Sequence, residues 1–341
     1  MSGKTDTKSD FDFHIVGASF AGSSLALSLL KNGRSVSIFD LAEPGYRLKC
    51  AGGVEMESFK RSGVDIPFEK CNRGILSLDG EMFDKKIDYA VVDRRKFDRA
   101  VFEKAVSNGA KFSKARYISH NPVDSTAKFS FDGDRREIKY DNLVLANGFR
   151  HIGKNIFFNP YSIATVEIVK GQSPHPHTLM FIFESGEMNG YYWIFPMPDG
   201  QVNIGAGAVT HFHLIEEKLK KFKKKYKLNG EIIAKGGGVI PLYPSLFPQD
   251  GSVSRFGNSA GMVQPITGEG LKYISRNSQG FADALTERRN VNIHWISSSS
   301  FLKLALSTFF LRLCFFGGNS GMSMYVALAK LATKLTDWRK I

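Results

Sequence analysis

The chain has 341 residues, of which 43% are hydrophobic and 23% charged, and this composition excludes a disordered or collagen-like protein. Its 46 Lys and Arg residues outnumber its 33 Asp and Glu residues, and the formal net charge of +13 indicates an anionic partner or surface. The three cysteines, Cys50, Cys71 and Cys314, exclude a disulfide-dense scaffold and favour a reducing compartment such as the cytoplasm.

The first part of the chain predicts a nucleotide-binding βαβ unit. Its start is polar and lacks the apolar stretch of a secretory signal, so we expect a loose tail there. A strand over 11–16 leads through a Gly-rich turn into a helix that stops at Gly33, and a second strand covers 35–40. Further strands are expected at 75–78 and 83–89, and a helix at 93–110.

The middle of the chain predicts an antiparallel sheet. A buried-type strand lies within 139–148, and four runs rich in aromatic and β-branched residues follow between 163 and 209. Helical spacing resumes over 213–228, and the glycines at 236–238 indicate a break. A Gly-rich loop and a helix occupy 255–289, and the last forty residues form a second, hydrophobic helical region.

The turn at residues 17–22 (GASFAG) has the spacing of a dinucleotide fingerprint, with Ser19 in place of the middle glycine. Small residues keep such a turn tight and let backbone N–H groups reach a pyrophosphate at the positive end of a helix. Asp40 ends the second strand, where a carboxylate can accept from both ribose hydroxyls and would repel a 2′-phosphate. This set favours a dinucleotide site over an ordinary strand–helix loop.

A second Gly-rich segment distinguishes FAD from NAD. Residues 256–271 (FGNSAGMVQPITGEGL) resemble the segment that holds the ribityl chain and flavin ring in glutathione-reductase-like and hydroxylase-like flavoproteins, and a plain NAD dehydrogenase needs no such loop. Asn258 stands where those flavoproteins usually have Asp, and Asn147-Gly148 stands where they have Asp-Gly. An amide still accepts a hydrogen bond from a hydroxyl but lacks the negative charge.

We therefore predict an α/β fold in which a Rossmann-like FAD-binding domain contains an inserted antiparallel-sheet substrate domain and is followed by a C-terminal helical region. The expected FAD domain is discontinuous and comprises 11–47, 90–162 and 252–290. The substrate domain comprises 48–89 and 163–251, and residues 291–341 form the C-terminal helices with possible membrane contact.

Three further stretches resemble the geranylgeranyl reductase family. They are the loop at 44–53 (PGYRLKCAGG), the helix start at 92–98 (VDRRKFD), and the element that joins YYWIFP at 191–196 to NIGAG at 203–207. With the two FAD segments, the match covers about residues 11 to 285, and the chain is shorter than typical members after that point.

The resemblance implies an FAD enzyme that saturates isoprenoid double bonds. Substrates in that family include geranylgeranyl diphosphate, the geranylgeranyl chains of chlorophyll and the digeranylgeranylglycerol phospholipids of archaeal membranes. The resemblance implies a set of FAD contacts. The Gly-rich turn contributes Gly17 and Gly22 to this set, and Tyr117 is a candidate for backbone contact with the adenine. The complete expected set is Gly17, Ala21, Gly22, Asp40, Cys50, Ala51, Gly53, Arg94, Tyr117, Asn258, Gly270 and Leu271.

Candidate catalytic residues are Cys50, Tyr191 and Trp193. Tyr191, Trp193 and Phe195 alternate along a strand and share one face, which makes either a flat apolar wall for a prenyl chain or part of the sheet core. The resemblance favours the wall for Trp193 and Tyr191. Cys50 is a proton donor, a residue that only shapes the pocket, or a small buried hydrophobe.

The proposed chemistry transfers a hydride from reduced FAD to one alkene carbon while the other carbon takes a proton. We find no metal-ligand cluster and no Ser/His/Asp arrangement at a revealing spacing. The electron donor is left open between NAD(P)H and a ferredoxin.

A prenyl-lipid substrate requires access to a bilayer. Residues 301–316 are mostly apolar but are interrupted by Lys303 and Arg312. The run is too short to span a membrane and is either an interfacial helix or a buried core helix. The helix at 214–228 has an apolar face and seven lysines, which are either simply solvated or contact anionic lipid heads. No nucleic-acid-binding signature accompanies the basic residues, so we expect a cytoplasmic protein peripheral to the membrane and no nucleic-acid partner.

Two alternatives remain. One is an FAD-dependent hydroxylase or monooxygenase of a lipophilic substrate. The other is a non-catalytic module that binds a prenyl lipid or a flavin, which the asparagines at 147 and 258 favour somewhat.

Overall fold

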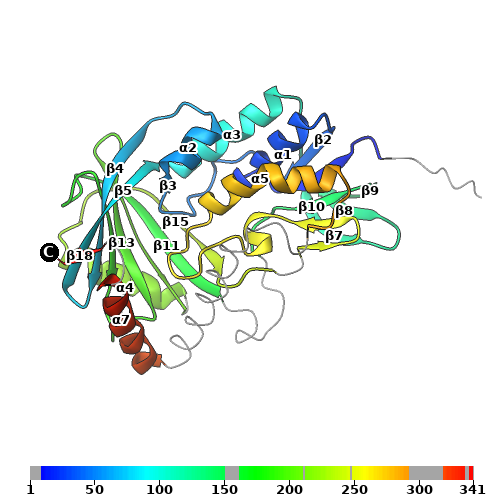
Figure 1. The fold of residues 1–341 in the computed structure, drawn as a ribbon. Helices are drawn as coiled ribbons and strands as arrows, with labels where there is room; N and C mark the ends of the chain where they lie inside the picture. Colours follow the sequence, from blue (N-terminus) through cyan, green and yellow to red (C-terminus); the bar gives the residue numbers. More distant parts are fainter. Residues whose placement is uncertain are drawn as a thin grey trace, which may run out of the picture.

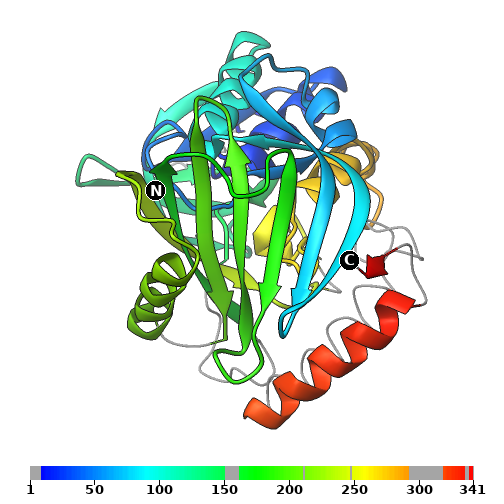
Figure 2. The same ribbon diagram turned by 90° about the vertical axis from the view of Figure 1, so that its left-hand side faces the viewer.

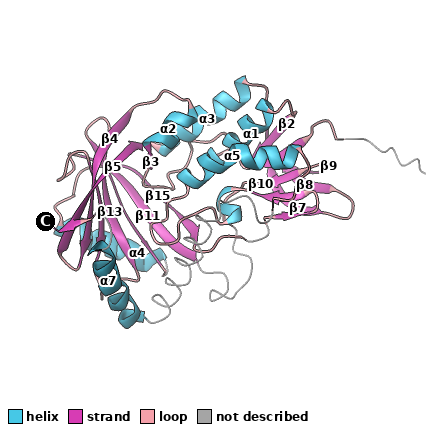
Figure 3. Ribbon diagram, viewed as in Figure 1, coloured by secondary structure: helices cyan, strands magenta, loops and turns pink. Residues whose placement is uncertain are grey.

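The computed structural model describes residues 9–149, 161–209, 212–245, 248–291, 318–334 and 338–340. Within these residues, two large sheets lie beside one another, and a small third sheet lies at the end remote from the larger one (Figures 1 and 3). The arrangement confirms the predicted α/β fold.

The first large sheet has the strand order β16-β17-β10-β1-β2-β6. All its strands run parallel except β16, which pairs antiparallel with β17 at one edge. Ile15 of the central strand aligns with Ile38 on one side and Val144 on the other, as expected for a parallel sheet covered on both faces. The strands are β1 (Phe13–Val16), β2 (Val36–Asp40), β6 (Lys111–Lys114), β10 (Leu143–Leu145), β16 (Gln249–Asp250) and β17 (Val253–Arg255).

Helices cover one face of this sheet, and the small sheet covers the other. The helices are α1 (Phe20–Lys31), α3 (Arg94–Ser107) and α5 (Leu271–Thr286), whose apolar faces share one core with β1, β2 and β10. On the opposite face, Phe39 packs against Phe129 in a tilted pair with ring centroids 4.3 Å apart. The small antiparallel sheet comprises β7 (Arg116–Asn121), β8 (Thr126–Phe131) and β9 (Asp134–Lys139).

The second large sheet has the order β15-β11-β14-β13-β12-β4-β5-β18, with the short β3 paired to β5. The four strand-like runs between 163 and 209 are confirmed as β11 to β14, and the two runs before residue 90 form one long hairpin. Its strands are β3 (Gly53–Glu55), β4 (Phe68–Leu78), β5 (Glu81–Val92), β11 (Tyr161–Lys170), β12 (Thr178–Phe183), β13 (Gly190–Met197), β14 (Gln201–Ala208), β15 (Ile232–Pro241) and β18 (Arg339–Lys340).

The predicted break at 236–238 is wrong, because these glycines lie inside β15 and pair with β11. The lack of side chains at these glycines lets the backbone around Leu48 lie close against the strand, and no turn forms there. A Cβ on Gly236 would lie 1.9 Å from the carbonyl oxygen of Leu48, and the N–H of Gly237 donates to the same oxygen at 3.1 Å. The edge strand therefore holds the loop that contains Cys50.

The amphipathic helix α4 (Phe212–Lys225) packs on the outer face of this sheet. Its Phe222 stacks on Tyr192 with ring centroids 4.2 Å apart. Lys223 donates to Glu167 of β11 at 2.5 Å, and both side chains are largely buried. The apolar face predicted from the helical spacing is thus a structural face, and the exposed lysines lie on the other side.

Helix α7 (Gly318–Lys334) lies along the edge of the second large sheet near β4 and β5 (Figure 2). This second sheet is called the large sheet below. Lys330 anchors it by donating to Glu81 at 2.7 Å. In the described part of the chain, no helix is long and apolar enough to cross a membrane. The apolar segment 301–316 lies outside the described residues.

Candidate functional site

The turn between β1 and α1 can be built only with glycines. Gly17 has φ +112°, and a Cβ there would lie 2.4 Å from the carbonyl oxygen of Ala146. A Cβ on Gly22 would lie 1.8 Å from the oxygen of Gly17. The turn is therefore tight, and the first turn of α1 contains no acidic side chain. A helix start of this kind favours a phosphate group.

Asp40 connects the end of β2 to this turn. One carboxylate oxygen accepts from the N–H of Ala18 at 2.8 Å, and the other accepts from the N–H of Leu41 at 2.7 Å. A carboxylate has about four acceptor sites, so both oxygens retain capacity for ribose hydroxyls. Tyr117 lies two residues after Ala115, whose N–H donates to the backbone carbonyl oxygen of Asp40 at 2.8 Å. The strand that carries Tyr117 therefore begins beside Asp40. The Tyr117 hydroxyl, however, lies 2.5 Å from His120 within the small sheet.

The late Gly-rich segment lies against the first turn, although more than two hundred residues separate them. Gly257 has φ +70°, and a Cβ there would lie 2.6 Å from the Cβ of Ala21. Ser259 donates to the carbonyl oxygen of Gly148 at 2.7 Å, and Asn258 Oδ1 lies 3.5 Å from the Cβ position of Gly270. The structure thus brings three segments together, at residues 17–22, 146–148 and 257–270.

The loop that carries Cys50 forms another wall of the site. Gly52 has φ +83°, and its N–H donates to the Cys50 sulfur at 3.5 Å. Arg94 at the start of α3 forms a two-pronged pair with Asp98, at 2.8 and 3.0 Å, and also hydrogen-bonds Cys50. Burial acts to lower the pKa of Arg94, but Asp98 and Cys50 outweigh it and raise that pKa.

The aromatic residues of β13 share one face, as predicted. Trp193 and Phe195 are buried in a cluster on the inner face of the large sheet, and Tyr191 packs at its margin. The Tyr191 hydroxyl donates to the carbonyl oxygen of Thr267, in the loop before α5. Tyr191 and Trp193 also line a small cavity of about 30 Å³ with Gly268. The wall and the late Gly-rich segment are therefore in contact.

A hydrogen-bond chain joins the wall to the Cys50 loop. Trp193 Nε1 donates to Asn203 Oδ1 at 2.9 Å, and Asn203 Nδ2 donates to the carbonyl oxygen of Cys50 at 3.2 Å. The remaining predicted residues lie around these groups. Gly53 lies beneath the ring of Phe195, and Ala51 packs against the cluster that contains Trp193 and Phe195. Leu271 is buried at the start of α5.

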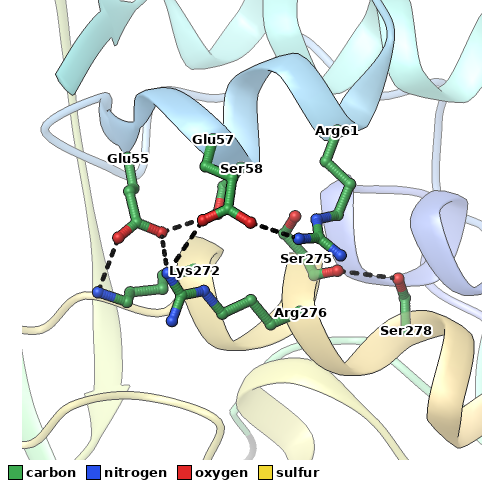
Figure 4. Close-up of polar contacts among 8 residues, drawn as sticks. All are labelled: Glu55, Glu57, Ser58, Arg61, Lys272, Ser275, Arg276 and Ser278. Carbon is green, nitrogen blue, oxygen red and sulfur yellow. Dashed lines mark hydrogen bonds and ion pairs between the residues drawn. The ribbon is translucent and has the colours of Figure 1, made fainter. Parts of the chain in front are cut away.

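A set of charged residues that no sequence motif marks lies beside the site. Glu55, just after the Cys50 loop, pairs with Lys272 at 2.9 Å and Arg276 at 2.8 Å (Figure 4). Glu57 extends the set by bonding Arg61 at 2.6 Å and Arg276 at 3.3 Å. These pairs join β3 and the following helix α2 (Met56–Ser62) to α5. The pairs to Lys272 and Arg276 join residues more than two hundred positions apart, so they left no local signal.

A second unpredicted contact involves Glu269. The hydroxyl of Tyr89 on β5 donates to Glu269 Oε1 at 2.9 Å. Burial raises the pKa of Glu269, and burial together with Glu269 raises the pKa of Tyr89. The only local sequence signal for Glu269 is its position between Gly268 and Gly270 of the Gly-rich segment that resembles an FAD-binding segment. Among the described residues, no group of three or more His, Cys, Asp or Glu side chains could hold a metal ion.

Comparison with known proteins places this geometry in a family. A family model described as lycopene cyclase protein matches residues 12–299. The chain belongs to the lycopene cyclase protein family. Digeranylgeranylglycerophospholipid reductase 2 of Methanopyrus kandleri is 26% identical over 290 residues, which cover 77% of this chain and 73% of that protein.

Solved structures of similar fold point the same way. A geranylgeranyl bacteriochlorophyll reductase-like protein of Thermoplasma acidophilum has a TM-score of 0.72 at 16% identity, covering 92% of this chain and 88% of its own. A flavin-dependent brominase has a TM-score of 0.67 at 15% identity, covering 89% and 85%. These neighbours confirm the predicted Rossmann-like α/β fold, and the similarity to the reductase of Methanopyrus kandleri confirms the resemblance to geranylgeranyl reductases.

Proposed function

We propose that this member of the lycopene cyclase protein family is an FAD-dependent reductase that saturates the double bonds of prenyl chains in isoprenoid lipids. The observation that carries the proposal is the convergence of the two Gly-rich segments beside the inner aromatic face of the large sheet. The similarity to a digeranylgeranylglycerophospholipid reductase supports the lipid substrate. The division into domains at the boundaries predicted above belongs to the same proposal.

The residues present fit FAD. The turn at 17–22 and the start of α1 would hold the pyrophosphate, Asp40 the adenosine ribose, and Asn258 the ribityl chain. Cys50, Ala51, Gly53 and Arg94 would border the flavin ring from one side, and Gly270 and Leu271 from another. Reduced FAD would supply the hydride. Tyr191 and Trp193 would orient the prenyl chain and exclude water.

A test of the proposed function begins with the visible spectrum of the purified protein, with and without added FAD. Protein that binds FAD is then reduced anaerobically and mixed with a phospholipid that carries two geranylgeranyl chains. A mass gain of two hydrogens per double bond is the expected result. A gain of one oxygen under air would indicate a hydroxylase, and an unchanged mass with a new product would indicate cyclisation. A protein that binds the lipid or flavin without turnover would be a binding module.

The electron donor is proposed to be NAD(P)H or a ferredoxin, and the same reduced-flavin assay can identify it. Each candidate donor would be mixed with the FAD-loaded protein, and bleaching of the flavin absorbance would show which of them reduces it.

We also propose peripheral contact with a membrane. Helix α7 exposes Met324, Leu328 and Leu331 at 45%, 39% and 54%, at spacings that place them along one side of the helix. Helix α4 exposes Lys220, Lys221 and Lys224. Both helices lie toward the same end of the large sheet (Figure 2). The apolar stripe of α7 and the exposed lysines of α4 lie on opposite sides of the sheet but toward its same end, an arrangement that suits an anionic bilayer surface.

A flotation assay tests this contact. We expect the double variant Leu328→Glu, Leu331→Glu to lose most of its binding to vesicles that contain anionic lipid, because moving the exposed part of the two leucines into the bilayer contributes roughly 1.5–3 kcal/mol in total. Val123→Glu is the matched control, since Val123 is 89% exposed and lies at the opposite end of the molecule. Equal flotation of the double variant and the control would contradict the proposal.

A further inference from the structure

The loop before α5 spans the centre of the proposed site. The Cβ position of Gly268 lies 3.6 Å from the Tyr191 hydroxyl, and that of Gly270 lies 3.5 Å from Asn258 Oδ1. Glu269 stands between these two glycines. It therefore lies between a residue of the aromatic wall and a residue expected to bind the ribityl chain.

The side chain of Glu269 is held against the same sheet face as the wall. Tyr89 donates to it at 2.9 Å and packs on the cluster that contains Trp193 and Phe195. The carboxyl group of Glu269 is therefore largely buried and linked to this cluster through Tyr89. The reduction needs a proton for every hydride, and an alkene carbon has no lone pair to attract a proton from bulk water.

We propose that Glu269, oriented by Tyr89, is the acid that delivers the proton to the substrate double bond. The inference rests on the proposed reductase function. The Glu269 O–H bond breaks, and its hydrogen forms a C–H bond at one alkene carbon. The hydride from reduced FAD forms the second C–H bond, so the alkene is reduced, the flavin is oxidised, and Glu269 is left as a carboxylate that solvent reprotonates. This assigns the proton to a carboxyl group rather than to the Cys50 thiol.

The burial of Glu269 allows it to hold a proton. Burial and the negative charge of Glu55 raise its pKa, while the hydrogen bond from Tyr89 and the positive charges of Lys272 and Arg276 lower it. Tyr273 is the other titratable group that faces it from α5. The net direction is upward, so the acid form persists above the usual range of a glutamate.

The test uses the FAD-loaded, anaerobically reduced protein and a phospholipid with two geranylgeranyl chains, and follows flavin oxidation in a single turnover. We expect Glu269→Gln to slow the reaction by about 100-fold or more, the usual contribution of a positioned acid. The matched control is Glu103→Gln, which removes an exposed carboxylate that pairs with Arg99 on α3 and is expected to leave the rate unchanged.

The pH dependence separates an acid from a merely structural residue. The wild-type rate is expected to fall as rising pH deprotonates Glu269. Tyr89→Phe removes a hydrogen bond that favours the carboxylate, so this fall should move to higher pH. Cys50→Ser should leave the position of the fall unchanged. A fall that follows Cys50→Ser and not Tyr89→Phe would overturn the proposal.

Stability of the FAD-free chain gives an independent readout. Because the folded-state pKa of Glu269 is raised, its stabilising contribution is complete below the unfolded pKa and is lost as pH rises through the folded one. Glu269→Gln should remove this loss and be at least as stable as wild type at neutral pH. If wild type itself fails to reduce the lipid, the proposed function fails. If wild type and Glu269→Gln react equally fast, only this inference fails.

Discussion

A Gly22→Ala variant is expected to bind FAD at least about 100-fold more weakly than wild type, a loss of about 2.7 kcal/mol. The added methyl group would lie 1.8 Å from the carbonyl oxygen of Gly17, a backbone atom that cannot rotate away. The turn must therefore open, and the N–H groups at the start of α1 would no longer converge on a pyrophosphate. Equilibrium titration with FAD, followed by flavin fluorescence, measures the effect.

Gly280→Ala is the matched control for this variant. Gly280 is exposed within α5, and a Cβ there would meet no atom within 4 Å. Alanine is the better helix former, so this change should raise stability by about 0.5–1 kcal/mol and leave FAD affinity unaltered. Affinities within threefold of wild type for Gly22→Ala would show that the turn does not hold the cofactor.

Replacing Asn203 by leucine is expected to lower the free energy of unfolding by about 2–6 kcal/mol, because two buried polar groups lose their partners at about 1–3 kcal/mol each. Asn203 is 1% exposed and is hydrogen-bonded on both sides, to Trp193 Nε1 and to the carbonyl oxygen of Cys50. Leucine has a similar volume, so the loss is mainly one of hydrogen bonds. Urea unfolding at neutral pH measures it.

The same variant should loosen the Cys50 loop. We expect alkylation of Cys50, followed by peptide mass mapping, to be faster in Asn203→Leu than in wild type. Trp193→Phe serves as the comparison, because it removes the indole N–H but keeps the bond between Asn203 and Cys50. An alkylation rate that rises equally in both variants would mean that the Asn203 amide does not position the loop.

The sequence alone determined the local elements and the two cofactor-like segments. Apolar and β-branched runs bounded by turn residues give β1, β2 and the strands β11 to β14 where they were expected, because such runs, the two-residue strand period and glycine placement are local properties. The aromatic face of β13 follows from the same period. Asp40 was identifiable because a strand end places its carboxylate beside the turn that follows β1.

Only the tertiary structure decided how distant residues meet. The glycines of β15 predict a break locally, but they accommodate the carbonyl oxygen of Leu48, an atom nearly two hundred residues away. The pair of Tyr89 with Glu269 and the bond from Asn203 to Cys50 likewise join segments that the chain separates widely. Such contacts depend on how the large sheet packs against α5 and the Cys50 loop, and no periodicity records that packing. The chain thus encodes its helices, strands and Gly-rich turns locally, whereas the chemistry between them arises from long-range packing.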